Sequence, residues 1–429
     1  MVLLLAVAAT VFYMFNSGQL VQEKIRLTNT ADAVAYSAGA FEARVLNYDA
    51  YTNRAIVANS IAVGQAVGLA SWAKYMGTSA DTISPYLNLI PYVGPALSRA
   101  MDYMATALDY LTAGLAHAVT LHDAAIQSLM VSQFAVHGPG NTIALVNRKR
   151  VMDEVARLND PDVTVDLLPL SDDFAGFTTR YASESERRRM GRIVHDSRDA
   201  FLRSRNWSFG LVALCNGVQL RKRGSTELID LVDGWKSMDT LSAHHYRIRR
   251  WRCRRSETPI GFGSAFSEDE LDDSGITYAG SRPTNPRASQ RADSSEGIAN
   301  GFDPAPPSIG GGAIPPFHEL SESALKADDP RTSLTIRVTK PASAQRYSGG
   351  SSTIQPQGRL ALYQGAAADG KSAAIARAEV YFERPDGHNP LHNKHELGSL
   401  FNPYWQVRLA PVGAGERLAA QLLQGRALP

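Results

Sequence analysis

The N-terminal residues read Met1-Val-Leu-Leu-Leu-Ala-Val-Ala-Ala-Thr-Val-Phe-Tyr-Met-Phe15, and no charged side chain occurs before Glu23. At about 1.5 Å per residue, a helix over this run is roughly 23 Å long, whereas the hydrocarbon core of a bilayer is about 30 Å thick. Residues 16–22 are therefore needed to complete a crossing, or the natural chain begins upstream. The run lacks the basic flank and the apolar length of a cleaved signal peptide, which favours an uncleaved single-pass anchor over residues 1–20.

The charges that follow this segment do not settle its orientation. Lys24 and Arg26 come directly after it, and by the positive-inside rule they point to a cytoplasmic body. Two cations so close to an anchor are a small bias, so charge alone leaves both orientations open.

A long α-helical hairpin is predicted over residues 21–137. No proline occurs before Pro85, and apolar side chains step by three and four along both arms, on either side of a break at residues 91–95. Two such stripes can bury each other in an antiparallel pair. The alternative is a seam of small side chains that packs against a helix of another copy or another protein, formed by Ala31, Val34, Ala38 and Phe41.

The remainder of the chain predicts an α+β body interrupted by a linker. Residues 138–264 contain a capping box, Ser183 with Glu186, that should start a helix ending near residue 205, and then strands that include 228–232 and 246–253. Residues 265–330 are rich in Gly, Pro, Ser and Asp, which is typical of a disordered linker.

The C-terminal part, residues 331–429, alternates apolar and polar side chains and predicts further strands, with a short helix over 416–424. We expect strands of 331–410 to pair back onto those of 211–264. The expected fold is therefore an anchor helix, a helical hairpin and a mixed body with one interrupted antiparallel sheet.

A literal phosphate-loop pattern, G-x-x-x-x-G-K-S, covers residues 365–372, with Gly365, Gly370, Lys371 and Ser372 at its defining positions. In a nucleotide-binding fold this loop joins a strand to a helix, and further strands follow. Here the segment after it, residues 378–382, resembles a strand, and too little chain remains for such a fold. A membrane-tethered nucleotide-binding protein is thus an alternative, and a hairpin loop is the preferred interpretation.

No other pattern predicts a catalytic, metal or cofactor site. His388, His392, His395 and Glu396 lie close together, but next to a proline and without an H-E-x-x-H motif, which favours surface histidines. The chain has no G-x-S-x-G elbow and no evident paired carboxylates. We therefore expect no enzyme activity and no cofactor.

Six arginines fall between Arg247 and Arg255, interleaved with apolar side chains whose alternation shifts at Arg249-Arg250, so a strand here requires a bulge. The strip is compatible with lipid headgroups, an acidic partner or nucleic acid, and equally with one solvated face of a strand. The net charge of the whole chain is only +2, so nucleic acid is not expected as a partner.

The only two cysteines, Cys215 and Cys253, belong to no CxxC pair, which excludes thiolate zinc ribbons and iron–sulfur clusters. In an exported chain they could form one disulfide, and two buried thiols are the alternative.

Two segments near the N-terminus resemble the TadE/TadG-like proteins of tight-adherence (Flp) pilus assembly. They are Arg26-Leu-Thr-Asn-Thr-Ala-Asp-Ala-Val-Ala-Tyr-Ser-Ala-Gly-Ala40 and Asn47-Tyr-Asp-Ala-Tyr-Thr-Asn-Arg-Ala-Ile-Val-Ala-Asn59. A further stretch, residues 400–409, is similar near the C-terminus. The likeness is good over about residues 1–70, and the D-x-S-x-S metal site of some members is absent from the sequence.

This resemblance implies a bacterial inner-membrane anchor with the bulk of the chain in the periplasm. It also implies a non-catalytic role beside other pilus-assembly proteins. A pilin-like structural subunit is a further alternative, for which the sequence offers no processing site ahead of the apolar run.

Overall fold

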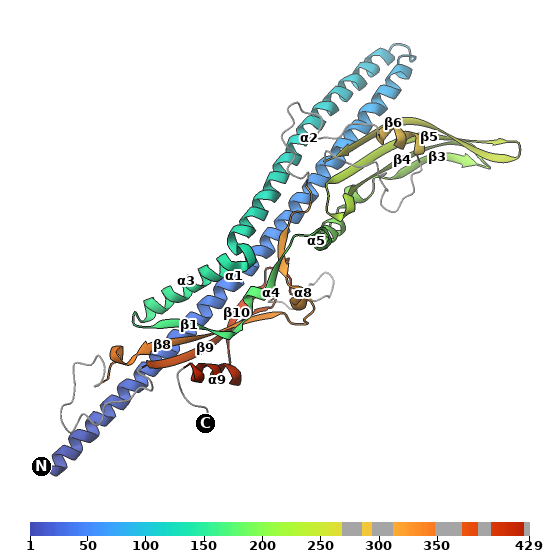
Figure 1. Ribbon diagram of the computed structural model, residues 1–429. Coiled ribbons are helices and arrows are strands. Elements are labelled where there is room, and N and C mark those ends of the chain that lie inside the picture. The colour runs from blue at the N-terminus through green and yellow to red at the C-terminus, as the bar shows by residue number, and fades with distance from the viewer. Residues whose placement is uncertain (268–284, 294–311, 348–370, 385–395, 424–429) are drawn as a thin grey trace. The chain divides into compact units, whose positions relative to one another are not determined.

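The computed structural model describes residues 1–267, 285–293, 312–347, 371–384 and 396–423. Two helices dominate its first third, α1 over Val2–Leu87 and α2 over Gly94–His137 (Figure 1). Helix α1 ends two residues after Pro85, and the turn to α2 contains Pro91, as expected because proline cannot continue a helix. The two helices are joined across this turn by a hydrogen bond between Ser84 and Ser98, whose Oγ atoms lie 2.6 Å apart.

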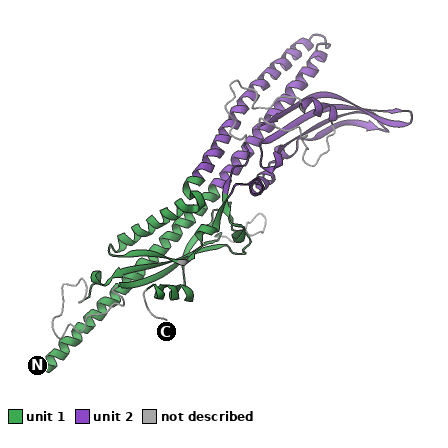
Figure 2. Cartoon of the chain, in the orientation of Figure 1, with its two compact units in different colours: residues 1–51, 133–180, 318–429 green, residues 52–132, 181–317 purple. Residues whose placement is uncertain are grey.

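The chain divides into two compact units that are each discontinuous in sequence (Figure 2). Unit 1 contains residues 1–51, 133–180 and 318–429, and unit 2 contains residues 52–132 and 181–317. The consecutive division into hairpin, body, linker and C-terminal part therefore does not follow the units, because segments far apart in sequence pair within each of them.

Unit 1 is built on a four-stranded antiparallel sheet with the order β1-β8-β9-β10. Its strands are β1 (Thr164–Asp172), β8 (Arg331–Pro341), β9 (Lys371–Phe382) and β10 (Trp405–Ala410). Three helices complete the unit, α3 (Thr142–Asn159), α4 (Phe174–Phe177) and α9 (Ala414–Leu422), together with the short α8 (Glu322–Leu325). Strands β2 (Thr178–Tyr181) and β7 (Phe317–Leu320) form a separate two-stranded sheet.

The expectation that the C-terminal strands pair with those of residues 211–264 is wrong. The C-terminal strands pair with each other and with β1, so the fold contains separate sheets instead of one interrupted sheet. Side-chain alternation sets which face of a strand is buried, but it carries no information on which strand lies alongside.

The core of unit 1 joins α1 and α3 to this sheet. Apart from Leu27, its members on α1 are alanines and one valine. They meet the alternate residues of three strands that face inward, including Leu334, Ile336 and Val338. Arg148 of α3 is also buried here and makes ion pairs with Glu42 of α1 and Asp172 of β1. These contacts bury one face of this part of α1.

Unit 2 contains a second four-stranded antiparallel sheet, in the order β3-β4-β5-β6. Its strands are β3 (Trp207–Ala213), β4 (Asn216–Leu228), β5 (Trp235–Arg249) and β6 (Arg252–Phe266). The helices α5 (Glu184–Asp196), α6 (Ala200–Arg203) and α7 (Pro286–Asp293) accompany it. The capping box of Ser183 and Glu186 is confirmed at the start of α5.

Glycines allow the sheet of unit 2 to approach α1 closely. A Cβ added at Gly64 would lie 2.9 Å from the ring of the buried Trp235, and one at Gly263 would lie 2.5 Å from the backbone nitrogen of Tyr75. Between these points Ser71 of α1 donates a 2.8 Å hydrogen bond to Asp239, which is ion-paired with Arg205 and Lys222. Polar contacts therefore fix the register of this helix on the sheet.

Four boundaries differ from the sequence expectation. The helix expected from Ser183 to near residue 205 ends at Asp196, and the separate short helix α6 follows it. The strand expected over 228–232 ends at Leu228 and is followed by a turn of 3₁₀ helix, and the strand expected over 246–253 is interrupted by a tight turn at Arg250-Trp251 instead of a bulge. The proposed linker over 265–330 contains α7, β7 and α8. Its composition is typical of loops, but these short elements pack against larger ones.

Candidate functional site

The phosphate-loop pattern lies largely outside the described residues. Gly365 and Gly370 fall there, while Lys371 and Ser372 open strand β9 and pair with Pro341 and Lys340 of β8. A phosphate loop needs a helix at this point, so that the helix N-terminus faces the phosphates. The histidines His388, His392 and His395 are also outside the described residues, and Glu396 forms an ion pair with Arg384.

The stripe proposed as a helix–helix seam is covered within its own unit. Ala31, Val34 and Ala38 are fully buried in the core that α1 forms with the β1-β8-β9-β10 sheet and α3, and Phe41 packs beside a neighbouring core cluster. The expectation that this stripe packs against the second helix is therefore wrong. The stripe meets a sheet because small side chains on a helix also allow close approach of strands.

Cys215 and Cys253 are joined by a disulfide, with their Cα atoms 5.6 Å apart. Cys215 lies in the turn between β3 and β4, and Cys253 lies near the start of β6. The bond thus links the ends of two β-hairpins.

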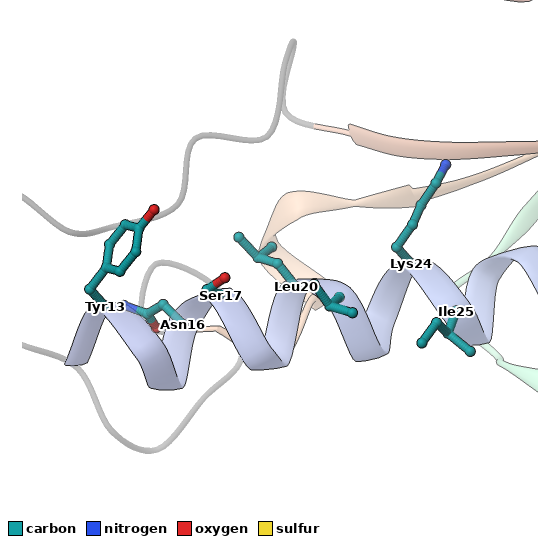
Figure 3. A pocket seen from close by; sticks show the side chains of 7 residues that line it. Tyr13, Asn16, Ser17, Leu20, Lys24 and Ile25 are labelled. Atoms are coloured by element: carbon teal, nitrogen blue, oxygen red, sulfur yellow. The ribbon is translucent and has the colours of Figure 1, made fainter. Parts of the chain in front are cut away.

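The N-terminal part of α1 is apolar and exposed. Leu3 is 81% exposed, Leu4 72% and Met14 68%, although such side chains are ordinarily buried in water-soluble proteins. Figure 3 shows the C-terminal end of this segment, in which Lys24 follows Tyr13, Asn16 and Ser17 on the same helix. The helix is long and apolar enough to cross a membrane.

The first charged residues after this segment are tied into the folded part of unit 1. Glu23 accepts a 3.0 Å hydrogen bond from the Nζ of Lys340, which also donates to Asp160 at 2.9 Å. All three are largely buried, and Arg26 lies 3.7 Å from the same Asp160 carboxylate. The body of unit 1 therefore begins within one or two turns of the exposed apolar helix.

A buried polar cluster, which the sequence analysis did not predict, joins four elements of unit 1. His137, the last residue of α2, lies with its Nε2 2.7 Å from Oδ2 of Asp49 on α1 and its Nδ1 2.8 Å from Oδ1 of Asn141. The ring of His318, on β7, stacks on that of His137 with centroids 4.0 Å apart and planes 10° apart. Asn141 in turn donates to Thr178 of β2 at 3.0 Å.

The environment shifts the pKa values of all three ionisable groups. Burial raises the pKa of Asp49, in spite of its hydrogen bond to His137. Burial opposes protonation of His137, but the hydrogen bond and charge of Asp49 outweigh it and raise the His137 pKa. Burial, followed by the charges of His137 and Arg180, lowers the pKa of His318 to about 3. One imidazole is thus held as a partner for a carboxylate, and the other is held neutral.

The arrangement suits a structural role better than a metal centre. Asp49, His137 and His318 offer ligand atoms within 4.8 Å of one another. An imidazole binds a metal along a lone pair in its ring plane, at about 2.0–2.1 Å for zinc. Two parallel stacked rings direct these lone pairs side by side instead of toward one point, and both nitrogens of His137 already have hydrogen-bond partners. The cluster therefore fixes α1, α2 and the β2-β7 sheet together.

Comparison of the chain with protein-family models, with curated proteins and with solved structures finds no match.

Proposed function

We propose that this chain is a non-catalytic, single-pass protein of the bacterial inner membrane, with its body in the periplasm, and that it serves the assembly of Flp-type pili. The observation that carries the anchor is the exposed apolar stretch of α1 before Glu23. Twenty-two uncharged residues at about 1.5 Å each extend roughly 33 Å, which matches the hydrocarbon core once Asn16 to Gln22 are included.

The ion pairs at the base of unit 1 support a body held close to the membrane. Glu23, Lys340 and Asp160 are buried together, and a buried charge that loses its partner costs about 3–5 kcal/mol. This network resists rotation of the anchor helix relative to unit 1. Force or movement at the anchor would thereby reach the body directly.

The disulfide supports the periplasmic side. A bond between Cys215 and Cys253 is stable in an oxidising compartment and is kept reduced in the cytosol of mesophilic bacteria. This observation outweighs the two cations after the anchor, which point to the opposite orientation. The assignment to pilus assembly rests on the resemblance of residues 1–70. It calls for no catalytic chemistry, and the buried, hydrogen-bonded Asp49–His137 pair is in keeping with a structural role.

The proposed function is tested by deletion of the gene and complementation, with surface pili counted by electron microscopy. Deletion should abolish or strongly reduce piliation, and the intact gene should restore it. Two exchanges of residues 1–20 then separate the anchor from the body. An unrelated uncharged transmembrane helix should restore pili, whereas a cleavable signal peptide, which releases the body, should not. Normal piliation in the deletion strain would refute the assignment to pilus assembly.

A further inference from the structure

The sheet of unit 2 ends in two adjacent β-hairpins that together form one exposed tip (Figure 1). Strands β3 and β4 turn at Leu214-Cys215, and β5 and β6 turn at Arg250-Trp251. The disulfide between Cys215 and Cys253 joins the first turn to the start of β6, two residues after the second turn. We call the surface made by Leu214, Ile248, Trp251 and the six arginines from Arg247 to Arg255 the hairpin tip.

Both turns place bulky residues in the left-handed backbone region. The φ angles are 48° at Leu214, 62° at Cys215, 52° at Arg250 and 60° at Trp251. Two-residue hairpin turns of this kind strongly favour Asn-Gly or Asp-Gly, because side chains with a Cβ are strained there. Strained conformations of this sort cluster at sites of function.

The apolar side chains of the tip point into solvent. Trp251 is 98% exposed, Leu214 93% and Ile248 60%. All seven residues of β3 are exposed as well, including Phe209 and Leu211. The disulfide and the ladder hydrogen bonds hold this apolar surface in place, so it is not a frayed end.

The positive charges of the tip face one another. Arg247 lies directly opposite Arg254 across the β5–β6 ladder, and Arg249 lies opposite Arg252. Side chains two residues apart on a strand point to the same face, so these two pairs share one face of the hairpin. Like charges in direct cross-strand pairs are destabilising unless something neutralises them.

The described strands around these pairs carry no neutralising carboxylate. No Asp or Glu occurs in residues 207–221 or 240–256, which cover β3, the first part of β4 and the tip-proximal parts of β5 and β6. The four guanidinium groups on this face are therefore exposed and available to an external anion. Guanidinium groups bind phosphate oxygens in a bidentate manner, which fits a phosphate-rich surface.

We propose that the hairpin tip binds the interface of a phospholipid bilayer that contains anionic lipids. Trp251 and Leu214 enter the boundary between headgroups and acyl chains, where the amphipathic indole ring is favoured. The arginines behind them contact headgroup phosphates, and each basic residue near an anionic leaflet adds to the attraction. An acidic protein surface would satisfy the charges, but it gives no reason for fully exposed tryptophan and leucine side chains at both turns. This membrane contact is separate from the anchor helix and does not depend on the pilus assignment.

The test uses the full chain with its anchor already embedded in nanodiscs of phosphatidylcholine, so that only the body is free to meet a second membrane. The loaded nanodiscs are floated with vesicles of phosphatidylcholine alone or mixed with phosphatidylglycerol. We expect recovery with the anionic vesicles only, and a decrease as salt is added. The variant Arg249→Glu with Arg252→Glu should reduce this recovery at least about tenfold.

A matched control reverses two exposed arginines elsewhere, Arg150→Glu on α3 with Arg192→Glu on α5, and should leave recovery unchanged. Intact disulfide by mass spectrometry and unchanged far-ultraviolet circular dichroism show that each variant is folded. No recovery of the unaltered chain with anionic vesicles would overturn the proposed membrane contact, as would equal losses in the two double variants.

Insertion is measured separately by quenching of tryptophan fluorescence with brominated phosphatidylglycerol. Quenching should occur in the unaltered chain and largely disappear in Trp251→Phe, which retains an aromatic ring and should still float with the vesicles. Equal quenching in both proteins would show that Trp251 stays out of the bilayer, which contradicts the proposed insertion. Binding to soluble polyglutamate with no binding to vesicles would assign the tip to an acidic protein instead.

Discussion

Asp49→Asn tests whether the buried cluster of unit 1 is held by a charged pair. The substitution keeps the shape and the hydrogen-bond acceptor near Nε2 of His137 but removes the negative charge. Hydrogen bonds to charged groups contribute about 1.5–3 kcal/mol, and relief of the burial cost that raises the pKa of Asp49 offsets part of this. We therefore expect unit 1 to lose up to that much stability near neutral pH.

The same substitution should reverse the pH dependence of this site. In the unaltered protein the pKa of His137 is raised above its ordinary 6.5, so its contribution to stability is complete below that value and is lost as pH rises through the folded pKa. Without Asp49, burial dominates and the pKa of His137 falls below its ordinary value. Stability is then lost as pH falls. Between about pH 8 and about pH 6, where an imidazole titrates, the variant should therefore lose stability relative to the unaltered protein.

Hydrogen–deuterium exchange read by mass spectrometry gives the free energy of unit 1 separately, from peptides of α3 and β8. Asp166→Asn is the matched control, since Asp166 forms a surface ion pair with Arg337 in the same unit and its side chain is 46% exposed. The control should cost less than about 1 kcal/mol. A loss no larger for Asp49→Asn than for the control, with an unchanged pH dependence, would refute the charged pair. Stoichiometric zinc lost on the same substitution would show instead that the cluster is a metal centre.

Three further outcomes follow from the packing. Gly263→Ala places a methyl group 2.5 Å from the backbone nitrogen of Tyr75 and should lower the stability of unit 2, measured by hydrogen exchange, by about 1–3 kcal/mol. Gly77→Ala, with nothing within 4 Å of the added methyl group, should instead stabilise α1 by about 0.5–1 kcal/mol. Effects of the opposite signs would contradict the close helix–sheet contact. Cys253→Ser opens a closure of 38 residues and should cost about 3–4 kcal/mol, seen as faster proteolysis of the hairpins, and an unchanged rate would count against the bond. Ala38→Leu overfills a fully buried position and should lower abundance in the membrane fraction, with recovery of partners falling in proportion; normal abundance with reduced recovery would restore the helix–helix seam.

Much of the helical part could be predicted because its signals are local. The absence of proline before Pro85, the break at Pro91 and the capping box at Ser183 each act within a few residues, and the structure places helix boundaries beside them. The signal of the apolar run before Glu23 is equally local, because a single helix over this run either lies in lipid or exposes its apolar side chains to water.

Strand pairing could not be predicted in the same way. Leu334, Ile336 and Val338 alternate clearly, but alternation assigns a face and not a neighbour, so the pairing with β1 was missed. The turns at Leu214-Cys215 and Arg250-Trp251 were missed because they lack the glycine or asparagine that normally marks such turns.

The buried cluster was missed for a related reason. Asp49, His137 and His318 come from three distant segments, and no spacing rule connects them. A histidine at the end of a helix before Gly138 looks like an ordinary C-terminal residue. Only the pairing of β7 with β2, beside the end of α2, brings the second imidazole against the first.

The central claim is that residues before Glu23 anchor a body that lies outside the cytoplasm. It is tested most directly by adding protease to intact spheroplasts and examining the chain that remains on carbonate-washed membranes. We predict that without protease the whole chain stays with the washed membranes, and that with protease the body is digested while a cytoplasmic marker survives. Release of the untreated chain by carbonate, or full protection of the body until the spheroplasts are lysed, would contradict the account.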